Sequence, residues 1–246
     1  MTDSSSARSC RELSETLSRT LHLAVPPIGI SFTDQAPAGV SAFDAPMSEP
    51  TPDGRAGRVP AGCVFWVRAS EKAFSTAPQD HGNCSVGSYT HGLAKLEDVA
   101  GNADIAALVE SGWVDPSAFG SIPAVSTSHD AIVYGPLSEA ASPPDVVLMR
   151  VNGRQMMVLS DSIPQMRIEG KPQCHIVAIA KEHGDVAASV GCALSRARTG
   201  MRPEEMTVAV PGERLVEVVD AVEKTAAVDN VVAKYAADDA RRFSAV

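Results

Sequence analysis

The chain has 246 residues, of which 44% are hydrophobic and 21% charged, a composition typical of a folded globular protein and unlike a disordered one. Its formal net charge of -9, with no basic cluster, excludes nucleic acid and anionic membranes as expected partners, because both attract positive surfaces. No apolar run is long enough to cross a bilayer, and residues 1–18 lack the apolar core of a signal peptide. We therefore expect a cytoplasmic protein whose partners are small molecules or proteins, with a homo-oligomer among the options.

The first part of the chain predicts a helix, a strand and a long loop. Leucines recur at helical spacing within Ser9–Leu23, so we expect an N-terminal helix within residues 1–24. The prolines and alternating apolar residues of VPPIGISF are typical of a turn that leads into a strand. Residues 33–60 are rich in Pro and Gly and lack periodicity, and we predict that they form a mobile cover. CVFWVRAS fits either a strand or a buried helix, because so short a run shows no clear period.

The rest of the chain mixes helix and strand signals. NADIAALVESGW predicts a helix that is capped by Asn102 and ends at Gly112. AIVYGPL, DVVLMRV and MTVAVPG are typical of strands, GRQMMVLSDS predicts a helix, and CHIVAIAKEHG predicts a core segment that stops at Gly184. A long amphipathic helical region follows Gly212. We therefore expect a mixed α/β (α+β) fold, in one domain over residues 25–246, with a central mixed sheet flanked by helices.

Four of the five cysteines fall into two similar pairs. Cys63 and Cys84 lie 21 positions apart, Cys174 and Cys192 lie 18 apart, and the second member of each pair sits in a glycine-containing loop. The loops DHGNCSVG and EHGDVAASVGC hint at an internal duplication, although short glycine-containing loops also match by chance. Cys10 stands in a polar N-terminal segment, and we expect it to be incidental.

The sequence lacks the common catalytic and cofactor motifs. It contains no GxGxxG after a strand, no GxxxxGK[ST], no HExxH and no GxSxG, so the corresponding mechanisms have no basis. CxxC pairs are absent, and the wide cysteine spacing argues against a zinc knuckle. Four thiolates gathered from separate segments would instead suit an iron–sulfur cluster. The alternative for each cysteine is the role of a small buried hydrophobic residue.

Several motifs, in a fixed order, resemble the DUF169 family of uncharacterised prokaryotic proteins. They are AGCVFWVRASEKAF, GNCSVGSYTHGL, IVYGPLSEAASPPDVVLMRVNGRQMMVL, CHIVAIA, SVGCALSR and MTVAVPGERL, and they extend over roughly Pro26 to Val222. The resemblance implies cysteines at the positions of Cys63, Cys84, Cys174 and Cys192, and all four are present. Many relatives read GCxGCR where this chain reads GCALSR, with Leu194 and Ser195 in place of a glycine and a cysteine.

The preferred hypothesis is a 4Fe–4S enzyme, either a lyase or an oxidoreductase. Three or four of Cys63, Cys84, Cys174 and Cys192 would hold the cluster, and an iron without a protein thiolate would act as a Lewis acid on a small, anionic substrate. An electron-transfer protein is a candidate partner for the redox case. The alternatives are a carrier or sensor that binds a metal or haem, with zinc among the metals, and a cofactor-free enzyme with a cysteine nucleophile.

Side chains close to the cysteines have candidate roles of their own. His81 and His91 flank Cys84 in QDHGNCSVGSYTHGL and are the candidate catalytic groups, with a polar loop role as the alternative. Asn83 and Tyr89, from the same loop, are candidate substrate contacts.

Candidate roles also fall to residues that follow Cys174 and Cys192. Arg196 is the third candidate substrate contact, because a guanidinium here, or at Arg198, can clamp a carboxylate or phosphate; a surface salt bridge is the alternative. His175 directly follows Cys174 and would point elsewhere on a helix, so we expect a structural role for it.

Overall fold

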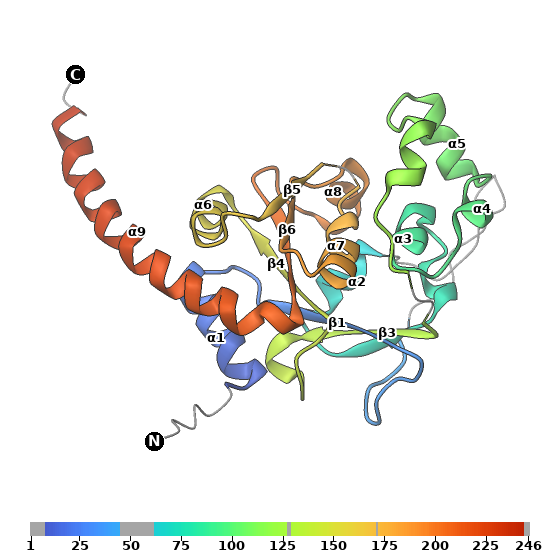
Figure 1. Ribbon diagram of the computed structural model, residues 1–246, viewed down its shortest axis with the longest axis horizontal. Coiled ribbons are helices and arrows are strands. Elements are labelled where there is room, and N and C mark those ends of the chain that lie inside the picture. The colour runs from blue at the N-terminus through green and yellow to red at the C-terminus, as the bar shows by residue number, and fades with distance from the viewer. Residues whose placement is uncertain (1–7, 45–61, 127–128, 171, 244–246) are drawn as a thin grey trace.

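The computed structural model describes residues 8–44, 62–126, 129–170 and 172–243. In Figure 1 they form a sheet with helices packed on both faces and a long C-terminal helix that extends away from the body. The predicted mixed α/β fold is therefore confirmed. No helix in these ranges is both long enough and apolar enough to span a membrane.

Among the described residues, seven strands form the sheet in the order β2-β3-β1-β4-β7-β6-β5. Neighbouring strands run antiparallel, except that β5 and β6 are parallel. The strands are β1 (Ile28–Thr33), β2 (Phe74–Thr76), β3 (Ala131–Pro136), β4 (Val146–Val151), β5 (Arg167–Glu169), β6 (Ala187–Ser189) and β7 (Met206–Pro211).

The helices range from single turns to the 29 residues of α9. The α-helices are α1 (Cys10–Leu21), α2 (Cys63–Arg68), α3 (Ser85–Thr90), α4 (Leu96–Val99), α5 (Ala103–Glu110), α6 (Gly153–Ser162), α7 (His175–His183), α8 (Ala193–Thr199) and α9 (Leu215–Phe243). The 3-10 helices are η1 (Pro78–His81), η2 (Pro116–Ser121), η3 (Leu137–Glu139) and η4 (Gly212–Arg214).

Alternation along the strands divides the interior into two hydrophobic cores. In β4, Val147 and Met149 face one core, with α1, α6 and α9, whereas Val146 and Leu148 face the other, with α2 and α7. All four side chains are at most 2% exposed. The strand is hydrophobic throughout because both faces of the sheet are covered.

Local signals explain where the predicted helices begin and end. Ser9 and Glu12 form a capping box at the start of α1, whose leucines pack into the first core. Gly184 ends α7 in the left-handed conformation at φ 67°, as the sequence predicted. CVFWVR is a helix rather than a strand, and Phe65 and Trp66 on it are buried. Cys10 is 5% exposed within the first core, where it acts as a small hydrophobic residue.

Most of the predicted mobile cover, residues 45–61, lies outside the described residues. The described part of this segment, up to residue 44, contacts the edge strand β2 of the sheet. Ala42 forms an isolated bridge with Ser75, and the Phe43 backbone N–H donates to the Ser75 carbonyl at 2.7 Å. The Phe43 ring packs against Phe65 with 4.8 Å between ring centroids. The mobility of this segment stays a prediction.

The sheet is built from two halves with the same connectivity. The first half runs β1-α2-β2-α3-β3 and the second runs β4-α7-β6-α8-β7, so the strand order 2-3-1 is mirrored by 4-7-6 around the β1–β4 pair. Contacts between the halves are also reciprocal, since α2 packs on α8 and α3 packs on α7. Topology therefore supports the internal duplication that the two loops hinted at.

Equivalent backbone details occur at the ends of β3 and β7. Pro136 and Pro211 have almost the same dihedral angles, φ -58° and ψ 133° against φ -57° and ψ 135°. The next residue of each half donates its N–H to the carbonyl just before the half's first strand, Leu137 to Pro27 at 2.9 Å and Gly212 to Asp145 at 2.8 Å. Similarity at this level of detail is what a repeated unit produces.

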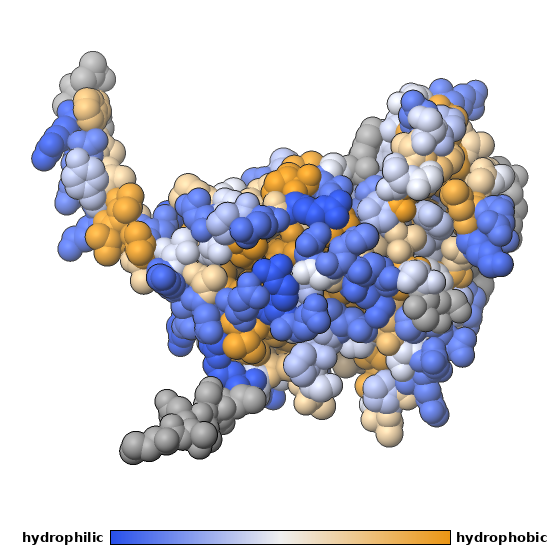
Figure 2. Space-filling view, viewed as in Figure 1, coloured by the Kyte–Doolittle hydropathy of each residue, from blue (hydrophilic) through white to orange (hydrophobic). Residues whose placement is uncertain are grey.

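The far end of α9 leaves the body of the protein (Figure 1). The space-filling view in Figure 2 shows hydrophobic surface on this arm. The large exposed apolar side chains of the described residues beyond 227 are Val228, Val231, Val232, Tyr235 and Phe243. Their spacing of three and four places several of them on one stripe of the helix.

Candidate functional site

The four cysteines predicted to act together line one cavity of about 40 Å³ on the α2/α7 face of the sheet. Each stands at the N-terminal end of a helix: Cys63 is the first residue of α2, and Cys84, Cys174 and Cys192 are the N-cap residues of α3, α7 and α8. The first turns of four helices therefore meet around the cavity.

The cysteine positions are equivalent in the two halves. Cys63 begins α2 and Cys174 caps α7, the helices that precede β2 and β6, and Cys84 and Cys192 cap α3 and α8, the helices that follow these strands. The sequence spacing of 21 and 18 residues in the two pairs reflects this repeat. The cavity thus lies where the two halves meet, and each contributes two thiols.

Backbone amides donate to two of the sulfur atoms. The Gly87 N–H points to Cys84 Sγ at 3.4 Å, and the Ser195 N–H points to Cys192 Sγ at 3.3 Å. A Cβ atom on Gly87 would stand only 3.3 Å from Cys84 Sγ, so glycine permits this close approach. Such N–H groups stabilise a thiolate and tune clusters that thiolates bind.

The cavity opposes free thiolates at two of its cysteines. Burial raises the pKa of Cys63, and the neighbouring Cys84 raises it further, whereas Ser195 and Arg198 partly offset this. Burial also raises the pKa of Cys174 strongly, again with Cys84 adding to the effect. Both thiols are therefore protonated at neutral pH unless a positive charge arrives to stabilise the thiolates.

His91 is the histidine that lines the cavity. It is completely buried, and Nδ1 lies 2.7 Å from the Gly87 carbonyl oxygen, which can only accept, so Nδ1 carries the proton. Nε2 then has a free lone pair and finds no hydrogen-bond partner among the described residues. Burial lowers the pKa of His91 to about 4, which keeps the ring neutral at pH 7.

His81 lies behind His91 rather than in the cavity wall, with 5.9 Å between the two ring centroids. Its Nε2 is 3.0 Å from Thr76 Oγ1, whose own hydrogen goes to the Ile132 carbonyl, so His81 Nε2 donates. Burial, with a smaller contribution from His91, lowers its pKa well below the usual value. Both histidines are thus neutral interior groups and only His91 reaches the cysteines.

The structure does not bring the three predicted substrate contacts into this cavity. The Asn83 carbonyl accepts from Arg198 at 3.3 Å, and the Tyr89 ring lines a separate apolar gap beneath α4 and α5. Arg196 donates to the backbone carbonyls of Val190, Arg202 and Glu205, so its guanidinium closes a loop. Their substrate-binding role stays a prediction.

Sequence reasoning gave less weight to three cavity residues. Arg198 lines the cavity although Arg196 was preferred, because residues two positions apart on α8 point to opposite sides of the helix. Gln173 and Ser195 also line it; the side-chain oxygen of Gln173 is buried without a hydrogen-bond partner in the described ranges, and the Ser195 side chain hydrogen-bonds to Cys63. Adjacency to Cys174 and Cys192 was the signal that would have found them.

A larger cavity of about 330 Å³ adjoins the first and shares Val86, Leu108, Trp113 and Pro172 with it. His175 lines this second cavity, so its side chain does point away from the cysteines, as the helix geometry predicted. Burial lowers the pKa of His175 to about 4.

The donor groups are not gathered tightly around one point. Within residues 8–44, 62–126, 129–170 and 172–243, no three His, Cys, Asp or Glu side chains converge closely enough to hold one metal ion. Four thiols and an imidazole nitrogen nevertheless share a cavity, and they are the donors that soft metals and iron–sulfur clusters take.

Comparison with known proteins gives a family and no activity. The chain matches the DUF169 family, described as uncharacterised ArCR, over residues 16–221 of 246. It belongs to this family. No curated protein and no solved structure matched the chain. The matched range includes both halves of the sheet and all four cavity cysteines, and it ends within α9.

Proposed function

We propose that the four-cysteine cavity binds an iron–sulfur cluster of the 4Fe–4S type, and that the protein uses this cluster on a small molecule. The observation that carries the proposal is the meeting of four thiols, from four helix N-termini, around one cavity. Four cysteines from distant segments exceed what one nucleophile needs, and thiolates are the usual ligands of such clusters.

The charge balance of the cavity supports a cationic guest with thiolate ligands. Burial and mutual proximity raise the pKa values of Cys63 and Cys174, so their ionisation needs compensation. The cationic core of a cluster supplies this compensating positive charge. The backbone N–H groups that donate to Cys84 and Cys192, and the guanidinium of Arg198, add to it. A cysteine nucleophile would need a lowered pKa, and neither Cys63 nor Cys174 has one.

The described donors do not converge on one point, which argues against a single zinc ion. One ion requires all its ligands within bonding distance of a single point, and the described donors do not meet this condition. A four-iron cluster holds its cysteine sulfurs farther apart, because each sulfur binds a different iron. Three or four of Cys63, Cys84, Cys174 and Cys192 would be the ligands, and with three of them one iron keeps no protein thiolate.

When bound, the cluster would act as an electron carrier or, at an iron without a protein thiolate, as a Lewis acid. The chain's own contribution is a neutral His91, whose Nε2 lone pair can accept a proton or a hydrogen bond within the cavity. The apolar walls Leu108, Trp113 and Leu194 limit the access of water. The redox case would also require an electron-transfer protein as partner.

The test is anaerobic purification followed by a visible spectrum and by iron and sulfide analysis. We expect broad brown absorption, with iron and sulfide in equal amounts. Cys84→Ala should lose most of the iron, whereas Cys10→Ala, at a buried cysteine outside the cavity, should retain it. A sharp haem band, zinc without sulfide, or iron that is unchanged in Cys84→Ala would each contradict the proposal.

A further inference from the structure

We infer that the 330 Å³ cavity beside the cysteines binds a small, uncharged, ring-shaped molecule with one hydrogen-bonding group, which contacts Nε2 of His175. This inference names the substrate class for the proposed function, and the bound molecule is a substrate only if that function is correct. The cavity itself contains none of the four cysteines. Its volume lies within the range, roughly 300–1,000 Å³, that small-molecule sites occupy.

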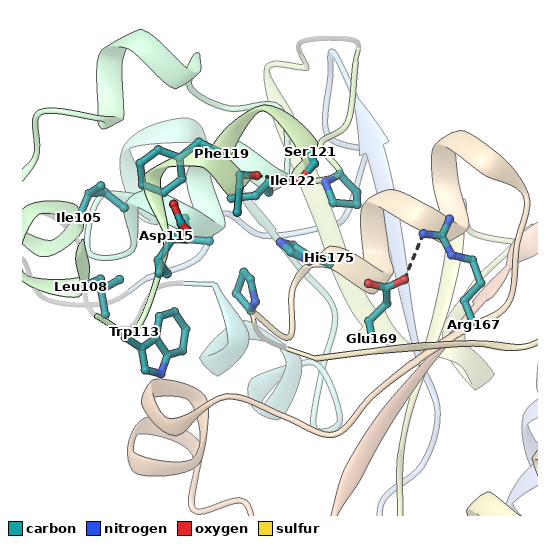
Figure 3. A pocket seen from close by; sticks show the side chains of 15 residues that line it. Ile105, Leu108, Trp113, Asp115, Phe119, Ser121, Ile122, Arg167, Glu169 and His175 are labelled. Atoms are coloured by element: carbon teal, nitrogen blue, oxygen red, sulfur yellow. Dashed lines mark hydrogen bonds and ion pairs between the residues drawn. The ribbon is translucent and has the colours of Figure 1, made fainter. Parts of the chain in front are cut away.

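The walls are mainly apolar and come from the segment between α3 and β3. Ile105, Leu108, Trp113, Phe119 and Ile122 surround one side of the space, and Figure 3 shows them opposite the Arg167–Glu169 ion pair, with the His175 ring between the two groups. Flat, polarisable side chains such as Trp and Phe favour an aromatic guest over a polar one.

His175 is the polar group in the wall that needs a ligand. His175 is only 8% exposed, and its Nε2 is buried without a hydrogen-bond partner in the described part of the chain. A buried nitrogen without a partner costs free energy, which a bound hydroxyl or carbonyl group would recover. Because His175 directly follows Cys174, a molecule that binds here lies next to the cysteine cavity.

The other polar wall groups already have partners. Arg167 is 3.0 Å from Glu169 and 3.6 Å from Asp185, so two carboxylates neutralise its charge. The Asp115 carboxylate accepts from the backbone N–H and the hydroxyl of Ser117, at 2.9 and 2.8 Å. Among the charged wall residues that the structure describes, two are acidic and one is basic, so these groups disfavour an anion. The structure thus favours a different charge class from the anionic substrate expected from Arg196.

The probes are 2-naphthol, 2-naphthoate and naphthalene, each titrated into the full-length protein by calorimetry or equilibrium dialysis. We expect 2-naphthol to bind at one site, at least tenfold more tightly than 2-naphthoate. His175→Phe keeps the ring volume but removes the hydrogen bond, so it should weaken 2-naphthol about three- to tenfold and leave naphthalene unchanged. Ala118→Trp, at an exposed position of the wall, should block both. Val232→Asn, on the exposed arm of α9, is the matched control.

Equal binding of 2-naphthoate and 2-naphthol, or unchanged binding in Ala118→Trp, would overturn the inference. An effect of His175→Phe that is equal for 2-naphthol and naphthalene would remove His175 from it. Iron content, measured on the same samples, separates the two claims. Brown protein that binds no probe contradicts the cavity assignment alone, and colourless protein that binds 2-naphthol contradicts the cluster alone.

Discussion

The two halves of the sheet share a scaffold and differ in what they insert into it. Both run from a central strand through a helix that begins with cysteine, an edge-side strand, and a short helix capped by cysteine. The first half then inserts α4, α5 and η2 before β3, whereas residues 200–205 alone join α8 to β7. The second half instead inserts α6 and β5 between β4 and α7.

This comparison separates two kinds of site. The cysteines belong to the part that the halves share, and the wall of the larger cavity comes mainly from the parts that differ. A cavity where the halves meet can receive equivalent ligands from each. An asymmetric molecule, by contrast, needs walls that are not repeated, and the α4–η2 and β5 insertions provide them.

The largest expected effect tests where the halves stop being equivalent. Leu137 and Gly212 occupy matching positions after β3 and β7, but a Cβ atom on Gly212 would overlap the backbone oxygen of Pro144. We expect Gly212→Ala to lower the free energy of unfolding by more than about 4 kcal/mol, because backbone must move. Urea unfolding measures this. Gly153→Ala, where a Cβ atom meets nothing within 4 Å, is the control and should change stability little.

A smaller effect tests the unequal placement of buried histidines. His91 has a pKa of about 4 in the folded protein and about 6.5 when unfolded, so between these values the unfolded chain binds more protons. Its contribution is present above pH 6.5 and decreases as the pH falls toward 4. Metal-free protein should lose about 2 kcal/mol from this group between pH 7 and pH 5.

His91→Leu removes that contribution, and the difference in unfolding free energy between pH 7 and pH 5 should shrink accordingly. The exposed His183 provides a control, His183→Leu. A pH dependence that is the same in His91→Leu and in the unaltered protein would show that His91 is not the buried neutral group described above.

The smallest effect, in free-energy terms, tests the equivalence of the cysteines. Cys63→Ala and Cys174→Ala change matching positions at the starts of α2 and α7. Each should reduce iron affinity at least tenfold, about 1.4 kcal/mol. The two reductions should be similar, because each variant removes one ligand from the same site. Iron content after dialysis against a chelator provides the measurement. Loss in only one variant would place the site within one half.

The amino-acid sequence alone determined the main elements of the fold. Strong local signals explain this: the capping box of Ser9 and Glu12, the left-handed Gly184, and apolar runs such as DVVLMRV depend on neighbours along the chain. The order of motifs also gave the family, which the match over residues 16–221 confirmed.

Tertiary structure decided the rest. CVFWVR became a helix because Phe65 and Trp66 had a core to enter, and the three-residue strands β2, β5 and β6 exist through pairing with distant neighbours. Tertiary structure also placed His91 in the cysteine cavity and His81 behind it, although both flank Cys84 in sequence. The meeting of four cysteines required the halves to pack, because no local interaction brings residues 63 and 174 together.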